Sequence, residues 1–253
     1  GAPLRFFLLA RVLKSSNLIT PPAERRTAIE RLATELHSGQ RVVLSTHMNA
    51  DGDACGSVTG LARLLRQLGI ESRIVKPRGW ATGVLNHKAG LMTNKKIRQA
   101  LQAALEMESI MAAGFGSKDF YRLDPGLFFP EQPWHSTVSA NLYNQRDKDK
   151  ARRLLKEAGY AKEPVRWVTT KEYEFMYKNA LVAKQQMEEV GFAVDLQVVD
   201  WATLNSRTQK PELWDVFSTG LVFSADPANH IALRCSWNGW WCHEEKEQLL
   251  SEL

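Results

Sequence analysis

The sequence contains no hydrophobic run long enough to cross a membrane, which takes about 20 consecutive apolar residues in a helix. The most apolar stretch near the start, residues 4–13, is short and is interrupted by Arg5 and Arg11. It also lacks a small-residue cleavage site before Lys14, so it predicts a short amphipathic helix and gives no clear signal peptide. We therefore expect no membrane insertion.

Long runs of one charge are absent as well. The formal net charge is +5 over 253 residues, and no run of Lys and Arg exceeds a few residues. The composition therefore does not indicate a nucleic-acid-binding surface. With 44% hydrophobic and 24% charged residues, the chain has the composition of a folded soluble protein. Its length allows one large domain or two small ones.

Cysteine is scarce, with three in the chain. Cys235 and Cys242 flank a short segment rich in Trp and Gly, and a pair this close predicts a small-loop disulfide in an oxidising compartment. Zinc ligation is the alternative, although His243 beside Cys242 supplies no second pair at ligand spacing. The spacing favours the disulfide.

Helical periodicity ended by glycine alternates with short apolar runs along most of the chain. The pattern predicts helices over residues 22–37, 58–68, 94–111, 147–158, 172–190 and 201–208. It predicts strands over residues 41–45, 71–75, 165–169, 193–199 and 214–219. Three prolines make residues 119–139 irregular. This alternation indicates an α/β fold.

An acidic loop follows the first predicted strand and carries His47, Asp51 and Asp53. The carboxyl edge of strands is where open α/β sheets bind ligands, and mixed nitrogen and oxygen ligands suit Mn²⁺ or Mg²⁺. The next helix would offer its N-terminus to a phosphate. These features predict metal-assisted phosphoester hydrolysis, with Asp51 and Asp53 as the catalytic candidates. The alternative is a polar loop in which both Asp residues serve as turn and cap.

Residues 47–57, His-Met-Asn-Ala-Asp-Gly-Asp-Ala-Cys-Gly-Ser, resemble the first motif of the DHH phosphoesterase family, and the resemblance extends over about residues 18–77. It implies manganese bound by His47, Asp51 and Asp53, and a nucleic-acid substrate. The later Asp-His-His triplet of that family does not occur in this sequence, nor does its glycine-rich substrate-binding module. A two-metal site is therefore incomplete, and the sequence favours a protein that is not an enzyme.

The rest of the chain carries a different set of motifs. Residues 92–101, 151–160, 185–192 and 214–217, taken in order, resemble the C-terminal lobe of the family 5 extracellular solute-binding proteins. The resemblance covers about residues 79–253. It implies an α/β lobe that binds a small peptide or similar solute and passes it to the permease of an ABC importer.

The resemblance also suggests site residues. Asp226, in the stretch 219–227, matches an Asp that pairs with the ligand amino group in peptide-binding members, and the alternative is an Asp-Pro turn that starts a helix. Trp201 and Trp214 would line the ligand cleft, and the alternative for both is core packing. Cys235 and Cys242 match a pair that peptide-binding members join as a disulfide.

We therefore expect a composite α/β chain, with a DHH-like β-α-β fragment over residues 1–77 joined to a periplasmic-binding-protein-like lobe over residues 78–253. The leading prediction is peptide-type solute binding, impaired because the family's other lobe is missing and closure around the ligand is lost. The alternatives are an Mn²⁺-dependent phosphoesterase or exonuclease, and a composite chain with no retained activity. The larger part predicts a periplasmic or extracellular location and the smaller part a cytoplasmic one.

Overall fold

The computed structural model describes residues 23, 27, 31, 44, 52–67, 70 and 79–253. The chain divides into two compact units, Gly1–Val75 and Lys76–Leu253. None of the helices among the described residues is both long and apolar enough to cross a bilayer.

The described part of the first unit is mainly the helix α3, Gly52–Gln67. Leu65 on this helix is buried, and its carbonyl accepts a hydrogen bond of 2.9 Å from the amide of Ile70. The helix begins six residues before the predicted start at residue 58, so Asp53 lies in its first turn and not in a loop. Of the predicted strand 41–45, Leu44 alone is described, and it lies in neither helix nor strand; the predicted strand 71–75 lies outside the described residues.

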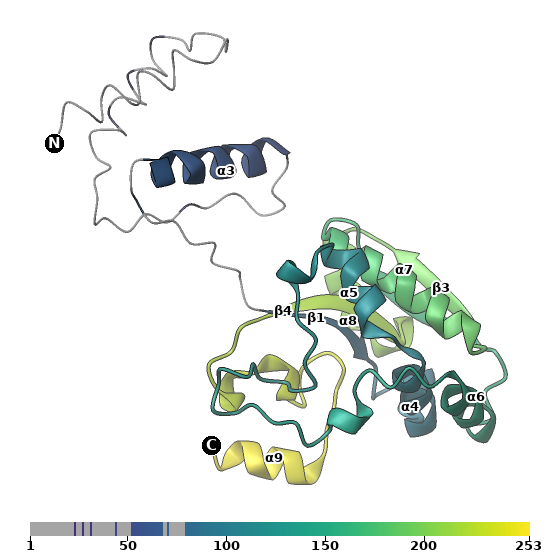
Figure 1. The fold of residues 1–253 in the computed structure, drawn as a ribbon. Coiled ribbons are helices and arrows are strands. Elements are labelled where there is room, and N and C mark those ends of the chain that lie inside the picture. The colour runs from purple at the N-terminus through teal and green to yellow at the C-terminus, as the bar shows by residue number, and fades with distance from the viewer. Residues whose placement is uncertain are drawn as a thin grey trace. The chain divides into compact units, whose positions relative to one another are not determined.

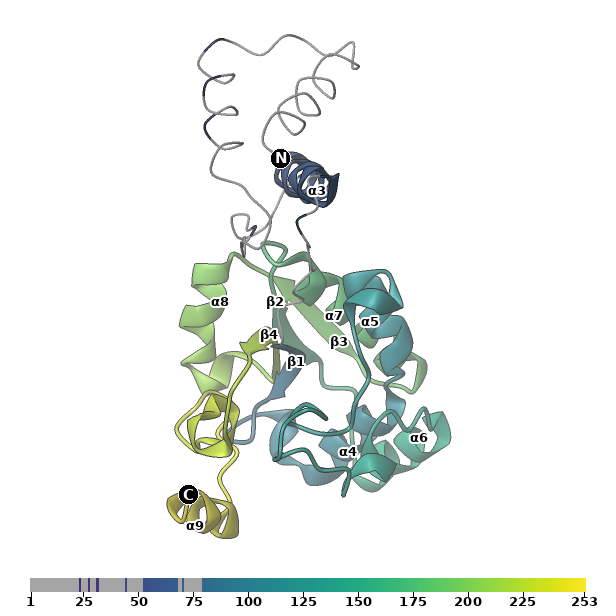
Figure 2. The same ribbon diagram turned by 60° about the vertical axis from the view of Figure 1, so that its left-hand side comes forward.

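The second unit contains a four-stranded mixed sheet, in which β1 and β4 lie side by side (Figure 1). The strand order is β1-β4-β2-β3 (Figure 2). The strands are β1 Gly79–Leu85, β2 Val165–Thr169, β3 Val194–Val198 and β4 Val216–Val222. β2 pairs in parallel with both β3 and β4, whereas β1 runs antiparallel to β4 with Gly79 opposite Val222. The sheet therefore has its first strand in sequence at one edge.

Helices cover both faces of this sheet, with α8 on one side and α5 and α7 on the other (Figure 2). The helices of the second unit are α4 Lys95–Ala104, α5 Met107–Phe115, α6 Lys148–Glu157, α7 Glu174–Glu189, α8 Trp201–Thr208 and α9 Glu244–Ser251. Single-turn 3₁₀ helices are η1 Leu91–Thr93, η2 Lys118–Phe120, η3 Ala140–Leu142, η4 Pro211–Leu213, η5 Pro227–Asn229 and η6 Ile231–Leu233.

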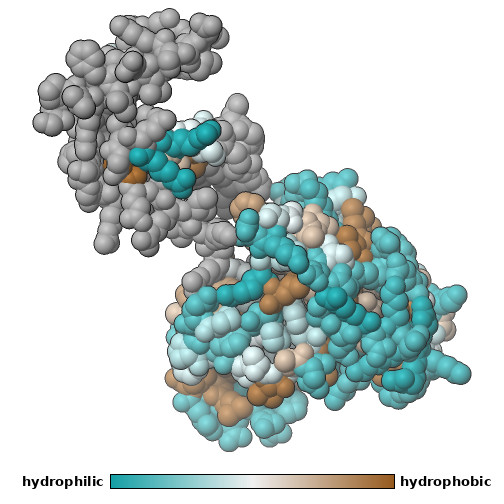
Figure 3. Space-filling model, viewed as in Figure 1, coloured by the Kyte–Doolittle hydropathy of each residue, from teal (hydrophilic) through white to brown (hydrophobic). Residues whose placement is uncertain are grey.

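Alternation along the strands divides the core into two clusters, because successive side chains of a strand point to opposite faces. Trp167 and Val216 belong to the larger cluster, which α4, α6 and α7 cover. Their neighbours Val168 and Phe217 belong to the smaller cluster, which includes Leu204 of α8. The second unit is therefore a three-layer lobe, and its mixed α/β fold confirms the α/β class predicted from the sequence. On the face shown in Figure 3 its hydrophobic side chains form small separate patches in a mostly hydrophilic surface.

The secondary structure of this unit differs in part from the prediction. The single helix expected over residues 94–111 is two helices, because Leu105 is extended and the Glu106 side chain accepts hydrogen bonds from the first amides of α5. The strand β1 and the helix α9 were not predicted, and the strand predicted over residues 214–219 lies at Val216–Val222 as β4. The strands at residues 165–169 and 193–199 and the helices at 147–158, 172–190 and 201–208 are confirmed within two residues at each end.

A buried ion pair fixes the start of β4 against β2 and against the turn after β1. The Asp215 side chain is 2% exposed, and its Oδ2 lies 2.9 Å from Nε of Arg166. The same carboxylate accepts hydrogen bonds from the backbone amides of Leu91 at 3.0 Å and Arg166 at 2.9 Å. Gly90 packs so closely here that a Cβ atom on it would lie 2.2 Å from Oδ1 of Asp215. One carboxylate thus joins three segments of the chain.

Candidate functional site

The candidate ligand site lies where the chain leaves β4. This strand ends at Val222 beside Gly79 of β1, and residues 223–229 follow at its carboxyl end. Ligands of open α/β sheets bind outside the carboxyl ends of the strands. Asp226 lies on this segment.

The Asp226 carboxylate is half-buried and already has a structural role. It caps the 3₁₀ helix η5, with Oδ1 accepting from the backbone amide of Asn229 at 3.1 Å. The Asn229 side-chain amide donates to both carboxylate oxygens, at 3.3 and 3.1 Å. These donors are neutral, and no Lys, Arg or His of the described residues forms an ion pair with Asp226. The carboxylate therefore caps a turn and still presents an uncompensated negative charge.

A row of stacked aromatic rings lies beside this segment, and we call it the aromatic row: Trp80, Phe129 and Phe223. The rings of Trp80 and Phe129 stack with centroids 4.8 Å apart and planes 11° apart. Phe129 and Phe223 are 6.1 Å apart with planes 5° apart. Phe223 is 44% exposed. The row thus presents the exposed ring of Phe223 on the same segment as Asp226.

The irregular segment 119–139 is tied to the end of β4 by a side chain. Gln132 donates from Nε2 to the carbonyl of Ser224 at 2.7 Å, and the Ser224 hydroxyl donates to the Asp226 carbonyl at 2.9 Å. These bonds fix the loop that carries Phe129 against the segment that carries Phe223 and Asp226. The aromatic row was not predicted from the sequence, since its three rings come from β1, a loop and the segment after β4.

A buried imidazole, that of His230, packs against Trp80 at one end of the aromatic row. His230 is 2% exposed, and its ring lies edge-on to Trp80 and to Phe128. Its Nδ1 accepts from the amide of Ala232 at 3.3 Å. Burial lowers the pKa of His230 below its ordinary value, so the ring is neutral at pH 7 and packs as an aromatic group.

The two tryptophans predicted to line the cleft have different surroundings. Trp201 is half-buried and lies edge-on to Tyr173 at 4.9 Å. Trp214 is 0% exposed and packs in the smaller core cluster against Phe217 and Trp240. A fully buried side chain cannot contact a ligand. Trp214 is therefore a core residue, which is the alternative to the prediction that it lines the cleft.

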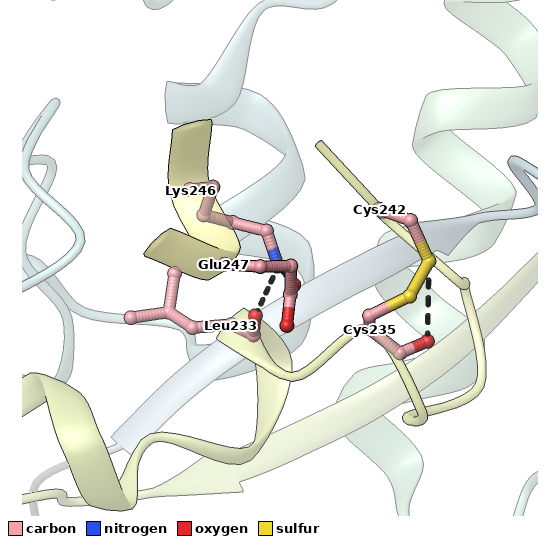
Figure 4. Close-up of a disulfide and its surroundings, with 5 residues drawn as sticks. All are labelled: Leu233, Cys235, Cys242, Lys246 and Glu247. Atoms are coloured by element: carbon pink, nitrogen blue, oxygen red, sulfur yellow. Dashed lines mark hydrogen bonds and ion pairs between the residues drawn. A yellow bond between two sulfur atoms is a disulfide. The ribbon is translucent and has the colours of Figure 1, made fainter. Parts of the chain in front are cut away.

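Cys235 and Cys242 are joined in a disulfide (Figure 4). It closes the short loop that carries Trp237, Trp240 and Trp241. Beside it the ammonium of Lys246 on α9 donates to the carbonyl of Leu233 and pairs with Glu247 (Figure 4). The disulfide therefore closes the loop, and Lys246 attaches the helix α9 to the segment that precedes Cys235.

The predicted metal site falls largely outside the described residues. His47 and Asp51 are not described, and of Asp53 the backbone alone is described, in α3. Within the part of the chain that the structure describes, no three His, Cys, Asp or Glu side chains come together to hold a metal ion. Manganese or magnesium at His47, Asp51 and Asp53 stays a prediction.

Comparison with known proteins is consistent with the architecture of the second unit. Residues 51–239 match the sequence profile of the family described as bacterial extracellular solute-binding proteins, family 5 Middle. The match begins at residue 51, so it includes part of the segment for which the sequence suggested a DHH phosphoesterase, and it supports the solute-binding family there and not the DHH family.

Two curated relatives are peptide-binding proteins by name. The probable peptide ABC transporter periplasmic-binding protein y4tO of Sinorhizobium fredii is 25% identical over 166 residues, which cover 61% of this chain and 31% of the relative. The oligopeptide-binding protein AppA of Bacillus subtilis is 28% identical over 156 residues, which cover 54% of this chain and 26% of AppA. The chain spans about a third or less of the length of these relatives.

Solved structures show the same fold. The substrate-binding protein CtaP of Listeria monocytogenes superposes with a TM-score of 0.66 at 19% identity, over 80% of this chain and 45% of CtaP. AppA of Bacillus subtilis, in complex with a nonapeptide, superposes with a TM-score of 0.52 at 20% identity, over 77% of this chain and 42% of AppA.

Proposed function

Because the chain belongs to family 5 of the bacterial extracellular solute-binding proteins, we propose that residues 79–253 bind the amino-terminal end of a small peptide for delivery to an ABC importer. The observation that carries the proposal is the Asp226 carboxylate, uncompensated and half-buried beside the aromatic row. The names of the curated relatives support a peptide as the solute.

The chemistry of the two groups is complementary to a peptide. A carboxylate that keeps its charge attracts a free ammonium group and accepts a short, charge-assisted hydrogen bond from it. The exposed ring of Phe223, at one end of the aromatic row, provides apolar surface for the peptide side chains. The disulfide between Cys235 and Cys242 supports an oxidising compartment as the place of action.

Binding by this chain alone is expected to be weak. Proteins that hold ligand between two lobes gain affinity from contacts on both sides and from closure. The lobe formed by residues 79–253 supplies one of these surfaces. We therefore expect a Kd for peptide on the order of 1 mM.

Replacement of the Asp226 charge tests the proposal. Asp226→Asn retains a side-chain oxygen that caps η5 but removes the charge, so we expect the Kd for trialanine to rise by about tenfold with little change in stability. Asp226→Ala loses the cap as well and is expected to cost about 1 kcal/mol of stability. The measurement is calorimetric titration with trialanine together with thermal unfolding.

Two controls accompany this experiment. Asp149→Asn removes a charge from a side chain that is 92% exposed on α6, and it should leave the Kd unchanged. N-acetyl-trialanine lacks the ammonium group and should bind the unsubstituted protein as weakly as trialanine binds Asp226→Asn. Equal affinity of the unsubstituted protein for both peptides would exclude Asp226 as the ammonium anchor.

The sequence pattern at residues 47–57 predicts metal-binding residues but not a complete phosphoesterase site. Since the Asp-His-His triplet is absent from the sequence, we expect the protein with Mn²⁺ to release no mononucleotide from a short single-stranded oligonucleotide, assayed by chromatography. Release that depends on Mn²⁺ and disappears in both Asp51→Ala and Asp53→Ala would establish the enzyme instead.

A further inference from the structure

A small pocket of about 160 Å³ lies between the disulfide loop and the end of β1. Asp226 and the aromatic row are not among the residues that line it. The residues that line it include His87, Arg234, Trp237, Trp240 and Trp241. Three Trp residues, a His and an Arg thus contribute to its lining, and none of the lining residues is acidic.

The backbone around the pocket is held in an unusual conformation. Gly239 has φ of 123° and Trp240 has φ of 49°, which a side chain as large as Trp seldom adopts. The amide of His87 donates to the Gly239 carbonyl at 2.9 Å, and a Cβ atom on Gly239 would lie 2.8 Å from Cγ1 of Val84. Strained positions of this kind concentrate at binding sites, where the surrounding contacts enforce them. Here the disulfide and the contact with β1 enforce the position of the Trp240 ring.

Positive charge borders the pocket. Arg234 donates from Nη2 to the Ala228 carbonyl at 2.8 Å, and in the part of the chain that the structure describes no carboxylate pairs with its guanidinium. The Lys88 ammonium lies 5.2 Å from the centre of the Trp240 ring. Lys246 lies 5.0 Å from the Trp241 ring but is paired with Glu247. Arg234, a lining residue whose guanidinium has no carboxylate partner among the described residues, and Lys88, beside the Trp240 ring, therefore place two cations at this pocket.

We propose that this pocket is a second ligand site, for a monocyclic aromatic carboxylate. The volume sets the size, since a protein cavity of about 150 Å³ accepts one benzene ring. The indoles supply stacking partners for the ring, and the guanidinium offers parallel N–H groups that match a carboxylate. The proposal is independent of the peptide site at Asp226.

The charge pattern selects between classes of small aromatic ligand. An aromatic amine would bring a further cation next to Arg234 and Lys88 with no acidic lining residue to compensate it. A neutral ring would fill the cavity but would leave the guanidinium with water as its partner. An aromatic carboxylate would stack its ring on the indoles and pair its charge with Arg234. It should therefore bind more tightly than the aromatic amine or the neutral ring.

Ligand-observed NMR on the full chain tests the proposal, with benzoate, benzamide and benzylamine as matched probes. We expect benzoate to bind with a Kd on the order of 1 mM and the other two at least about tenfold more weakly. Arg234→Gln should raise the Kd for benzoate by about tenfold, and Trp241→Ala should raise it about fivefold by removing a stacking partner. Trp241 is 45% exposed, so its replacement is compatible with folding.

Matched substitutions elsewhere provide the controls. Arg153→Gln removes a charge from α6, where the side chain is 65% exposed, and Trp134→Ala removes a ring that is 42% exposed. Both should leave the Kd for benzoate within about twofold of the unsubstituted value. Benzamide binding as tightly as benzoate, or no benzoate binding at tens of millimolar, would overturn the proposal. The comparison of probes on the unsubstituted protein decides it even if Arg234→Gln fails to fold.

Discussion

Asp215→Ala is expected to lower the free energy of unfolding of the larger unit by about 3 kcal/mol, since removal of one partner from a buried ion pair costs about 3–5 kcal/mol. Arg166 is 31% exposed and can reach water, which places the expected loss at the lower end of that range. The two backbone amides that Asp215 accepts from, those of Leu91 and Arg166, would lose their partners. Both hydrogen bonds are part-buried, so water can replace the lost acceptor, and the expected total stays at about 3 kcal/mol.

Urea unfolding followed by tryptophan fluorescence measures this loss, and it reports on the larger unit because every Trp lies at residue 80 or later. Asp195→Ala on β3 is the matched control. Its carboxylate is exposed and accepts one hydrogen bond from a side chain, Gln197, at 2.6 Å, so a change within about 0.5 kcal/mol is expected. Equal losses in the two variants would show that the Asp215 pair does not stabilise the fold.

Much of the larger unit could be predicted from local sequence pattern. The helices and strands between residues 147 and 208 have clear periodicity, and glycine follows two of the helices at positive φ, 67° at Gly159 and 106° at Gly191. Glycine adopts such φ values without the steric penalty that a Cβ imposes. These signals are carried by neighbouring residues, which is why a single sequence contains them.

The elements that were missed depend on partners far away in the chain. Gly79 and Gly83 weaken the strand signal of β1, and its pairing with β4 joins residues more than a hundred positions apart. The break at Leu105 was hidden because apolar residues continue on both sides of it and the capping residue is Glu106, an uncommon cap.

Some residues of the candidate site could likewise be predicted from the sequence, and others could not. Asp226 could be predicted as a ligand residue because residues 219–227 resemble the corresponding stretch of the solute-binding family, while the Asp-Pro pair is the local signal for the capping role that the structure shows. The aromatic row could not be predicted, since Trp80, Phe129 and Phe223 meet only in the folded lobe. Composition also could not decide whether a given Trp lies in the core or at the surface.

Trp214→Ala is expected to cost about 3–5 kcal/mol of stability, the usual range for replacement of a fully buried large aromatic side chain by Ala. The Trp214 ring is 0% exposed, and it contacts Phe217 edge-on at 4.9 Å and stacks with Trp240 at 5.7 Å. Its loss would leave a cavity beneath β4 and remove a neighbour of the disulfide loop. A side chain that lined a ligand cleft would instead show a small loss of stability and a large loss of peptide binding.

Two further variants separate these possibilities when unfolding is followed by far-UV circular dichroism. Trp201→Ala removes a half-buried ring and is expected to cost about 1–2 kcal/mol, because less apolar area is lost. Trp214→Phe retains a ring and removes an indole N–H that has no acceptor among the described residues, so it should recover most of the stability lost in Trp214→Ala. A Trp214→Ala protein as stable as Trp201→Ala would contradict the assignment of Trp214 to the core. Because Trp240 of the disulfide loop stacks on the Trp214 ring, that result would also show that this stacking does not stabilise the loop.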